Sequence, residues 1–154
     1  MKSKDFDFDI VIVGLGPAGG TLANLLAMHN LSVLILERES GIYNLPRAVH
    51  FDDEIMRVFQ TIGITDKFLK HTIINKGTKF VNSKNKVLLD WPRPRSVTEN
   101  GWYPSYRFNQ PDLERKLRSR LKDFKKVFTM QNTKVTSLNA VSYTHLTLPT
   151  KCSV

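Results

Sequence analysis

The sequence holds a single cysteine, Cys152, so it has no disulfide framework and no zinc site built from cysteines. No stretch approaches the roughly 20 uninterrupted apolar residues that a membrane-spanning helix needs. The opening residues MKSKD are not followed by the apolar core and small-residue cleavage site of a secretory signal. These absences predict a cytoplasmic protein without a metal site.

The composition is that of a globular protein, because 41% of the 154 residues are hydrophobic and 24% are charged. A chain of this length can bury enough surface to fold as one domain without a covalent staple. The net charge of +9 is uneven: residues 1–60 hold 5 Lys or Arg against 8 Asp or Glu, and residues 61–154 hold 18 against 6. The basic part would suit a nucleic acid, but the favoured interpretation is the lysine-rich surface of an incomplete protein.

The first forty residues have the pattern of a strand–helix–strand unit. Residues 9–13 and 32–36 are apolar runs rich in β-branched residues, as in strands buried in a parallel sheet. Residues 17–29 between them predict a helix that stops at Asn30. Its expected buried side consists of Ala18, Leu22, Leu25, Leu26 and His29. The predicted fold class is α/β, a Rossmann-like unit with parallel strands.

The rest of the chain predicts two helices and a hairpin. The acidic residues 52–54 open a helix that ends at Gly63, and residues 77–91 form the hairpin, followed by an irregular loop over 92–105. The expected buried stripe of that helix is Ile55, Val58, Phe59 and Ile62. Another helix starts at Gln110 as N-cap, with Leu113, Leu117, Leu121 and Phe124 buried and Lys122, Lys125 and Lys126 in its last turn. Two short strands, 127–130 and 134–138, complete the prediction.

The strongest motif is Gly14-Leu-Gly-Pro-Ala-Gly19, a GxGxxG at the junction of the first strand and helix. In this context Gly14 permits the tight turn, Gly16 lets a pyrophosphate approach the backbone, and Gly19 lets the helix pack against the strand. Glu37, at the end of the second strand, is placed to accept hydrogen bonds from a ribose. The motif predicts a site for NAD or FAD and does not separate the two.

Three ordered segments resemble the FAD-dependent aromatic hydroxylases of the para-hydroxybenzoate hydroxylase superfamily, with the closest likeness to the 3-(3-hydroxyphenyl)propionate hydroxylases. They are the run from Ile10 to Arg38, the Leu45-Pro-Arg-Ala48 segment, and Arg107-Phe-Asn-Gln-Pro-Asp-Leu-Glu114. The resemblance implies that Arg38 lies near the adenine end of FAD, that Arg47 and Gln110 reach its ribityl and phosphate part, and that Val135 lies beside the adenine. The resulting cofactor-binding set is Gly14, Gly16, Pro17, Ala18, Gly19, Glu37, Arg38, Arg47, Gln110 and Val135.

The resemblance implies an intact parent that hydroxylates a phenolic aromatic acid with FAD, O2 and either NADH or NADPH. The Asp-Gly and Gly-Asp flavin motifs of that family do not occur in the sequence, so residues 1–140 are interpreted as the N-terminal part of the FAD-binding domain, inactive by itself. No residue present is a secure catalytic base, and the catalytic set is left empty. Two alternatives stay open: an NAD-dependent dehydrogenase and a basic nucleic-acid-binding module.

The last segment, residues 141–154, is interpreted as foreign to the protein. Its first ten residues, VSYTHLTLPT, can be read in one frame from a transposon adapter used in sequencing libraries. The alternative is a native tail that forms a short strand closed by Pro149.

Overall fold

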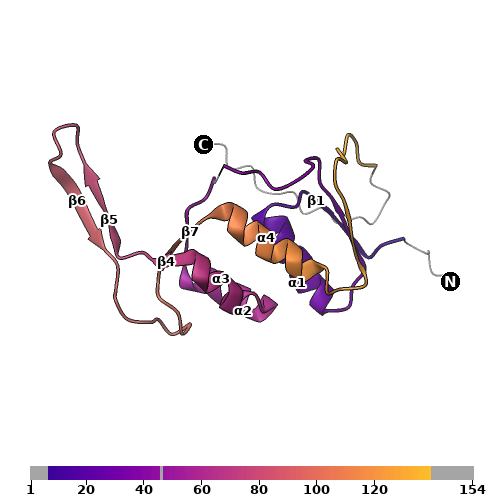
Figure 1. The fold of residues 1–154 in the computed structure, drawn as a ribbon, viewed down its shortest axis with the longest axis horizontal. Helices are drawn as coiled ribbons and strands as arrows, with labels where there is room; N and C mark the ends of the chain where they lie inside the picture. Colours follow the sequence, from indigo (N-terminus) through magenta and orange to yellow (C-terminus); the bar gives the residue numbers. More distant parts are fainter. Residues whose placement is uncertain (1–6, 46, 140–154) are drawn as a thin grey trace.

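The fold is built around a small parallel sheet of β1 (Ile10–Val13), β2 (Val33–Leu36) and β8 (Val127–Met130), in the order β1-β2-β8. The computed structural model describes residues 7–45 and 47–139, so residues 141–154 lie outside the described part (Figure 1). Val33 pairs with Ile10 on one side and with Val127 on the other. The predicted α/β class, with parallel strands, is confirmed.

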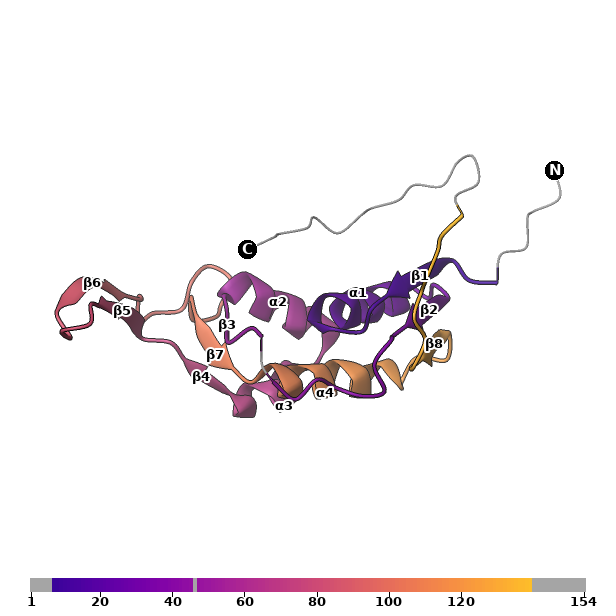
Figure 2. The same cartoon turned by 90° about the horizontal axis from the view of Figure 1, so that it is seen from above.

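One face of this sheet is covered and the other is open. Helices α1 (Pro17–Met28) and α4 (Gln110–Leu121) pack on the same face, over Ile12, Val33 and Ile35 (Figure 2). On the opposite face half or more of each side chain is exposed at Val11, Val13, Phe128 and Met130. Parallel sheets are normally covered on both faces, so this domain has room for a second layer.

The predicted buried side of helix α1 is only partly right, because Leu25 and Leu26 are half-buried and pack against the hydrophobic cores but are not its most buried residues. Its buried residues are Gly20, Ala23, Asn24 and Ala27, whereas Ala18, Leu22 and His29 are exposed. The reason is the close approach of α4, since a Cβ added at Gly20 would lie 3.4 Å from the Cβ of Leu117. Small side chains therefore face α4 and the sheet, and the leucines lie toward the sides. The stop at Asn30, with a φ of 61°, agrees with the prediction.

Helix α2 (Asp53–Ile62) confirms its predicted ends. Asp52 is the N-cap and its side chain accepts a hydrogen bond from the Ile55 N–H, while Gly63 ends the helix with a φ of 82°. The predicted stripe is partly wrong, because Met56 is fully buried and Ile55 is 41% exposed. The chain continues through α3 (Thr65–Phe68) and the 3₁₀ turn η1 (Leu69–His71).

A second, antiparallel sheet was not predicted. It joins β3 (His50–Phe51), β7 (Tyr106–Phe108) and β4 (Thr72–Ile74) in the order β3-β7-β4. The predicted hairpin is confirmed as β5 (Gly77–Val81) and β6 (Val87–Pro92), and it projects away from the helices (Figure 1). Residues 93–105 are irregular, as expected.

The prediction for α4 needs correction at both ends of the helix. The N-cap is Asn109, whose side chain accepts from the Asp112 N–H, so Gln110 is already inside the helix. The helix ends at Leu121, which leaves Lys125 and Lys126 beyond its last turn, with Lys122 as C-cap and Phe124 outside the helix. Strand β8 is confirmed, but residues 134–138 form no strand.

Two hydrophobic cores hold these layers together. The aliphatic core lies between the parallel sheet and its helices and consists of Ile12, Leu15, Ala23, Val33, Ile35 and Leu121. The aromatic core lies between α2, α3, α4 and the antiparallel sheet and consists of Phe51, Met56, Phe59, Ile62, Ile64, Phe68, Tyr106, Leu113 and Leu117. Helix α4 contributes to both cores and so ties the two parts of the molecule together.

Candidate cofactor site

The glycine turn after β1 has the backbone geometry that its motif predicts. Gly14 has a φ of 102°, which side chains rarely tolerate, and its N–H donates to the Leu36 carbonyl at 2.8 Å. A Cβ added at Gly19 would lie 2.1 Å from the Gly14 carbonyl oxygen, so only glycine fits there. A Cβ at Gly16 would meet nothing within 4 Å. Gly14 and Gly19 thus shape the turn, and Gly16 leaves open space in front of it.

The N-terminus of α1 is left open to a ligand. Gly16 is its N-cap without a side-chain hydrogen bond, and no acidic residue stands in the first turn. Pro17 has no N–H, and the amides of Ala18 and Gly19 belong to the first turn, where no carbonyl of the helix is available to them. Free amides and the positive end of the helix dipole together suit a phosphate.

The Glu37 carboxylate is hydrogen-bonded to the backbone of the glycine turn. Its Oε2 accepts from the Leu15 N–H at 2.6 Å and its Oε1 accepts from the Glu39 N–H at 2.9 Å. Burial raises the pKa of this carboxyl, but these N–H donors and the positive charge of Arg118 outweigh burial and hold the pKa below its ordinary value. The group is therefore ionised at neutral pH, and each oxygen keeps a lone pair for a ribose hydroxyl.

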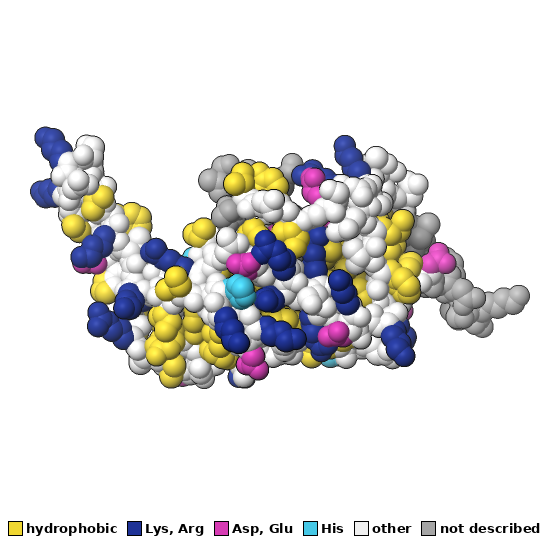
Figure 3. Space-filling view, viewed as in Figure 1, with side chains coloured by type: hydrophobic (Ala, Val, Ile, Leu, Met, Phe, Trp, Pro, Cys, Tyr) yellow, Lys and Arg dark blue, Asp and Glu magenta, His cyan; other side chains and the backbone are white. Residues whose placement is uncertain are grey.

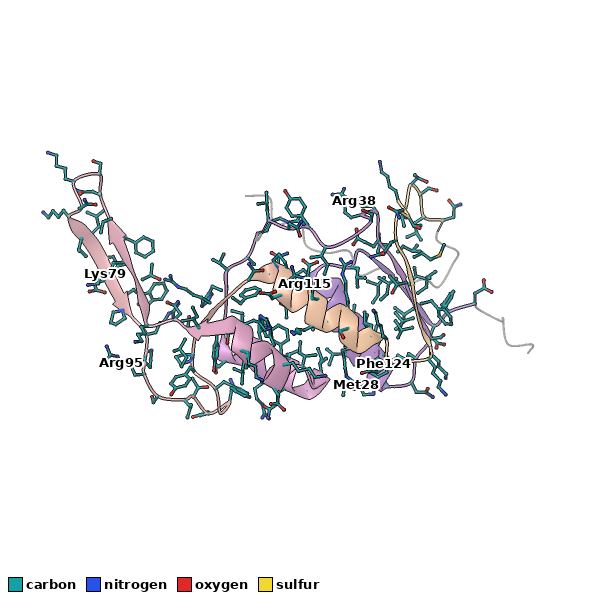
Figure 4. All side chains as sticks on the ribbon, in the orientation of Figure 1. Met28, Arg38, Lys79, Arg95, Arg115 and Phe124 are labelled. Atoms are coloured by element: carbon teal, nitrogen blue, oxygen red, sulfur yellow. The ribbon has the colours of Figure 1, made fainter. Side chains whose placement is uncertain are left out.

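A cavity of about 590 Å³ lies at the carboxyl ends of β1 and β2. Its walls are Val13, Gly14, Leu36, Glu37, Arg38, Glu39, Tyr43, Arg47, Thr133, Lys134 and Val135. Five of the predicted cofactor residues therefore meet in one place. Arg38 lies on the outer loop after β2, where its Nε donates to Glu39 at 2.9 Å (Figure 4).

Arg47 and Gln110 are brought together by residues 47–49, which lead into β3 and are called the Arg47 loop below. The guanidinium of Arg47 lies over the Tyr43 ring, 5.0 Å from its centre, and faces the cavity. The backbone N–H groups of Arg47 and Ala48 both donate to the Gln110 Oε1, at 2.9 and 2.8 Å. Gln110 is only 5% exposed and lies beneath this loop, outside the cavity wall.

The other six residues of the cavity wall are not in the predicted set. Val13, Leu36 and Glu39 adjoin predicted residues in sequence, whereas Tyr43, Thr133 and Lys134 do not lie beside the glycine motif or Glu37. Ligands of open α/β sheets bind beyond the carboxyl ends of the strands, and Thr133 and Lys134 lie three and four residues after the end of β8. That rule is the signal which points to them. Tyr43 stands four residues before Arg47 in an irregular loop, and no pattern in the sequence distinguishes it.

Other kinds of site find little support in the described ranges, 7–45 and 47–139. They contain no group of three or more His, Cys, Asp or Glu residues able to hold a metal ion. None of the helices described there is both long and apolar enough to cross a bilayer. On the face shown in Figure 3, Lys and Arg side chains lie over the helices and on the hairpin, and Asp and Glu side chains lie among those over the helices. His50 bonds through Nε2 to the Ser105 Oγ at 2.7 Å.

The donor set fits a dinucleotide. Open amides at the start of α1 suit a pyrophosphate, and the ionised Glu37 beside the cavity suits the ribose hydroxyls. A carboxylate at that point disfavours a 2′-phosphate, so the adenosine end suits FAD or NAD better than NADP.

The sequence model of the FAD binding domain family matches residues 7–144. A probable NADH-specific resorcinol 4-hydroxylase of Rhodococcus jostii is 46% identical over 108 residues, which are 69% of this chain and 20% of that protein. A 3-(3-hydroxy-phenyl)propionate/3-hydroxycinnamic acid hydroxylase of Mycolicibacterium gilvum is 38% identical over 125 residues, 81% of this chain and 22% of that protein. The chain thus spans about a fifth of the length of these relatives.

Solved structures show the same fold. The p-nitrophenol 4-monooxygenase PnpA of Pseudomonas putida matches with a TM-score of 0.71 at 20% identity, over 80% of this chain and 31% of that one. PqsL of Pseudomonas aeruginosa in complex with 2-aminobenzoylacetate matches with a TM-score of 0.74 at 17% identity, over 88% of this chain and 36% of that one. The chain belongs to the FAD-binding monooxygenase family and carries the N-terminal portion of its FAD-binding fold.

Proposed function

We propose that this chain forms the dinucleotide-binding part of an FAD-dependent aromatic hydroxylase. The observation that carries the proposal is the cavity in which Gly14 of the glycine turn, the ionised Glu37 and Arg47 meet. Gly16, Pro17, Ala18 and Gly19 do not line this cavity, and their proposed role rests on the uncapped start of α1. The start of α1 at Gly16, Pro17, Ala18 and Gly19 would hold the pyrophosphate. Glu37 would bind the adenosine ribose.

The remaining predicted residues receive roles by their place around the cavity. Arg38 and Val135 would flank the adenine end, because both line the cavity beyond the ends of β2 and β8. The guanidinium of Arg47 would meet the phosphate or ribityl part, and Gln110 would act on that part by holding the Arg47 loop.

The proposed reaction of the longer parent protein is hydroxylation of a phenolic aromatic acid with O2 and NADH or NADPH. FAD, when bound, supplies the redox chemistry of that reaction. The residues of this chain bind and orient the cofactor, and none of them is proposed to transfer a proton. The names of the resorcinol and hydroxyphenylpropionate hydroxylases support a phenolic substrate.

The parent protein would also supply the missing layer of the fold. Val11, Val13, Phe128 and Met130 leave one face of the parallel sheet exposed, and relatives are about five times as long as the aligned segment. We infer that further chain packs on this face in the parent. Residues 1–140 are the proposed extent of the domain part, and residues 141–154 are proposed to be foreign adapter sequence. Resequencing the source locus beyond codon 140 tests both statements, since an uninterrupted frame through Val154 would contradict them.

Cofactor binding is tested by titrating the chain with FAD and following flavin fluorescence, with ADP and NAD as competitors. Val135→Glu places a negative charge in the cavity and should weaken FAD binding about tenfold or more, because the bound adenine would strip water from a carboxylate that has no partner there. Leu138→Glu is the matched control, since Leu138 is 66% exposed and does not line the cavity. Equal affinities of the two variants would contradict the proposed site, and tighter binding of NAD than of FAD would favour the dehydrogenase alternative.

A further inference from the structure

A buried hydrogen-bond network starts under the Arg47 loop. Gln110 uses its Oε1 to accept from two backbone N–H groups of that loop, those of Arg47 and Ala48. Its Nε2 donates to the Glu114 Oε1 at 2.9 Å. The loop is therefore attached to a carboxylate one turn further along α4.

Glu114 is the centre of the network. It is 4% exposed, and its second oxygen, Oε2, lies 3.4 Å from the Arg118 Nη2. The Arg118 side chain is 15% exposed, so this ion pair is largely shielded from water. A buried carboxylate and guanidinium are costly to desolvate, and a hydrophobic pair would fill the same space without that cost.

The network ends at the glycine turn. Arg118 Nη2 also donates to the Leu15 carbonyl oxygen at 3.1 Å, and the N–H of Leu15 donates to the Glu37 carboxylate at 2.6 Å. A continuous path of hydrogen bonds thus joins the Arg47 loop to the glycine turn and to the Glu37 carboxylate, which is proposed to bind the ribose. Helix α4 supplies every side chain between the Arg47 loop and the Leu15 carbonyl.

We propose that Glu114 is a positioning residue that couples the two cofactor-binding segments, the Arg47 loop and the Gly14–Gly19 turn, through Gln110 and Arg118. This inference rests on the proposed function in one respect, namely that the coupled segments hold FAD. The carboxylate is needed because it accepts at both oxygens at once, which no neutral side chain of that size does. Ordering of one segment then favours the bound geometry of the other.

The first test needs no cofactor. Amide hydrogen exchange is measured at Leu15 and Ala48, and Ile35 in the aliphatic core reports global opening. Glu114→Leu removes both acceptors and should speed exchange at Leu15 and Ala48 about tenfold relative to Ile35. Glu114→Gln keeps one acceptor and should speed only one of the two sites, since a single amide oxygen serves either Gln110 or Arg118.

The control is Arg115→Met on the same helix. Arg115 is 56% exposed and lies on the outer surface of α4 (Figure 4), where it pairs with Asp112. It should leave the exchange ratios unchanged. A merely structural role of Glu114 would speed Leu15, Ala48 and Ile35 equally, and that result would overturn the proposal.

The second test uses FAD. Glu114→Leu should weaken FAD binding about tenfold while ADP binding falls less, because ADP engages only one of the two coupled segments. An equal loss for both ligands would overturn the coupling. If the unaltered chain binds neither FAD nor ADP, the proposed function fails, and the exchange experiment still decides whether the two segments are coupled.

Discussion

The aliphatic core and the aromatic core differ in the size of their side chains and in the elements that they hold in place. The aliphatic core is made of small and branched side chains, and it allows the glycine turn and α1 to approach β1, β2 and α4 closely. The aromatic core is filled by large rings, with Phe51 in contact with Phe59, Phe68, Tyr106 and Phe108. Large rings bury much area per residue, so the aromatic core can fix short strands that would not form alone.

The helices also differ in whether a side chain caps their N-terminus. Helices α2 and α4 are closed at their N-termini by the side chains of Asp52 and Asn109, whereas α1 begins at Gly16 with no side-chain cap. Capping satisfies amides that would otherwise need another partner. The first amides of α2 and α4 thus have a side-chain acceptor, whereas those of α1 have none and are open to a ligand.

The largest expected effect is in the aromatic core. Phe68 is 0% exposed, and Phe68→Ala should lower the free energy of unfolding by about 3–5 kcal/mol through lost contacts and a cavity. Urea unfolding followed by circular dichroism measures it. Phe80→Ala on the hairpin, where the ring is 49% exposed, should change stability by less than about 0.5 kcal/mol. Similar losses at both positions would contradict the assignment of the core.

The second-largest expected loss of stability tests the close approach of Gly19 to the Gly14 carbonyl oxygen, beside the aliphatic core. Gly19→Ala places a Cβ against the Gly14 carbonyl oxygen and should cost about 2–3 kcal/mol, because backbone must move to relieve the contact. Gly41→Ala is the control, since a Cβ there meets nothing within 4 Å. Thermal unfolding of the two variants separates them. A Gly19→Ala protein as stable as the control would show that the turn is looser than described.

Replacing Glu37 should lower the free energy of unfolding by an amount that depends on pH. Its folded-state pKa lies below the ordinary value, so its stabilisation is present above about pH 4.3 and is lost as the pH falls through the lower folded-state value. Glu37→Gln should therefore cost about 1–2 kcal/mol at neutral pH, because the N–H groups of Leu15 and Glu39 both lose a charged acceptor and the single amide oxygen serves only one of them. The difference should shrink below about pH 4.3. Urea unfolding at several pH values measures it, with the exposed Glu39→Gln as control; a gap that is constant with pH would contradict this account.

The parallel unit and its cofactor turn were predictable because their signals are local. The glycine spacing, two β-branched runs and Glu37 all lie within the first forty residues, and each position has a physical requirement that few residues meet. The buried side of α1 was not predictable, because it depends on α4. Asn24, for example, donates to the Leu117 carbonyl oxygen at 3.1 Å, almost a hundred residues away.

The antiparallel sheet has no such signal. Strand β3 is two residues long and β7 and β4 are three each, so alternation of side chains cannot be recognised in them. The start of α4 was misplaced for a related reason: Asn109 and Gln110 are neighbouring polar residues before Pro111, and either could precede a helix. The structure chooses Asn109, and this choice frees Gln110 to hold the Arg47 loop.

The smallest expected effect on stability is a gain that sharpens the contrast between the helix starts. Gly16 has an extended backbone, with a φ of −80°, which any residue can adopt, and there is open space around it. Gly16→Ser would give α1 the side-chain cap it lacks and should raise stability by about 0.3 kcal/mol. The same hydroxyl would occupy an amide proposed to bind the pyrophosphate, so FAD affinity should fall while thermal stability rises. Gly41→Ser is the control, since it should move neither quantity. A variant that gained stability and kept its FAD affinity would show that the open end of α1 is not where the phosphates bind.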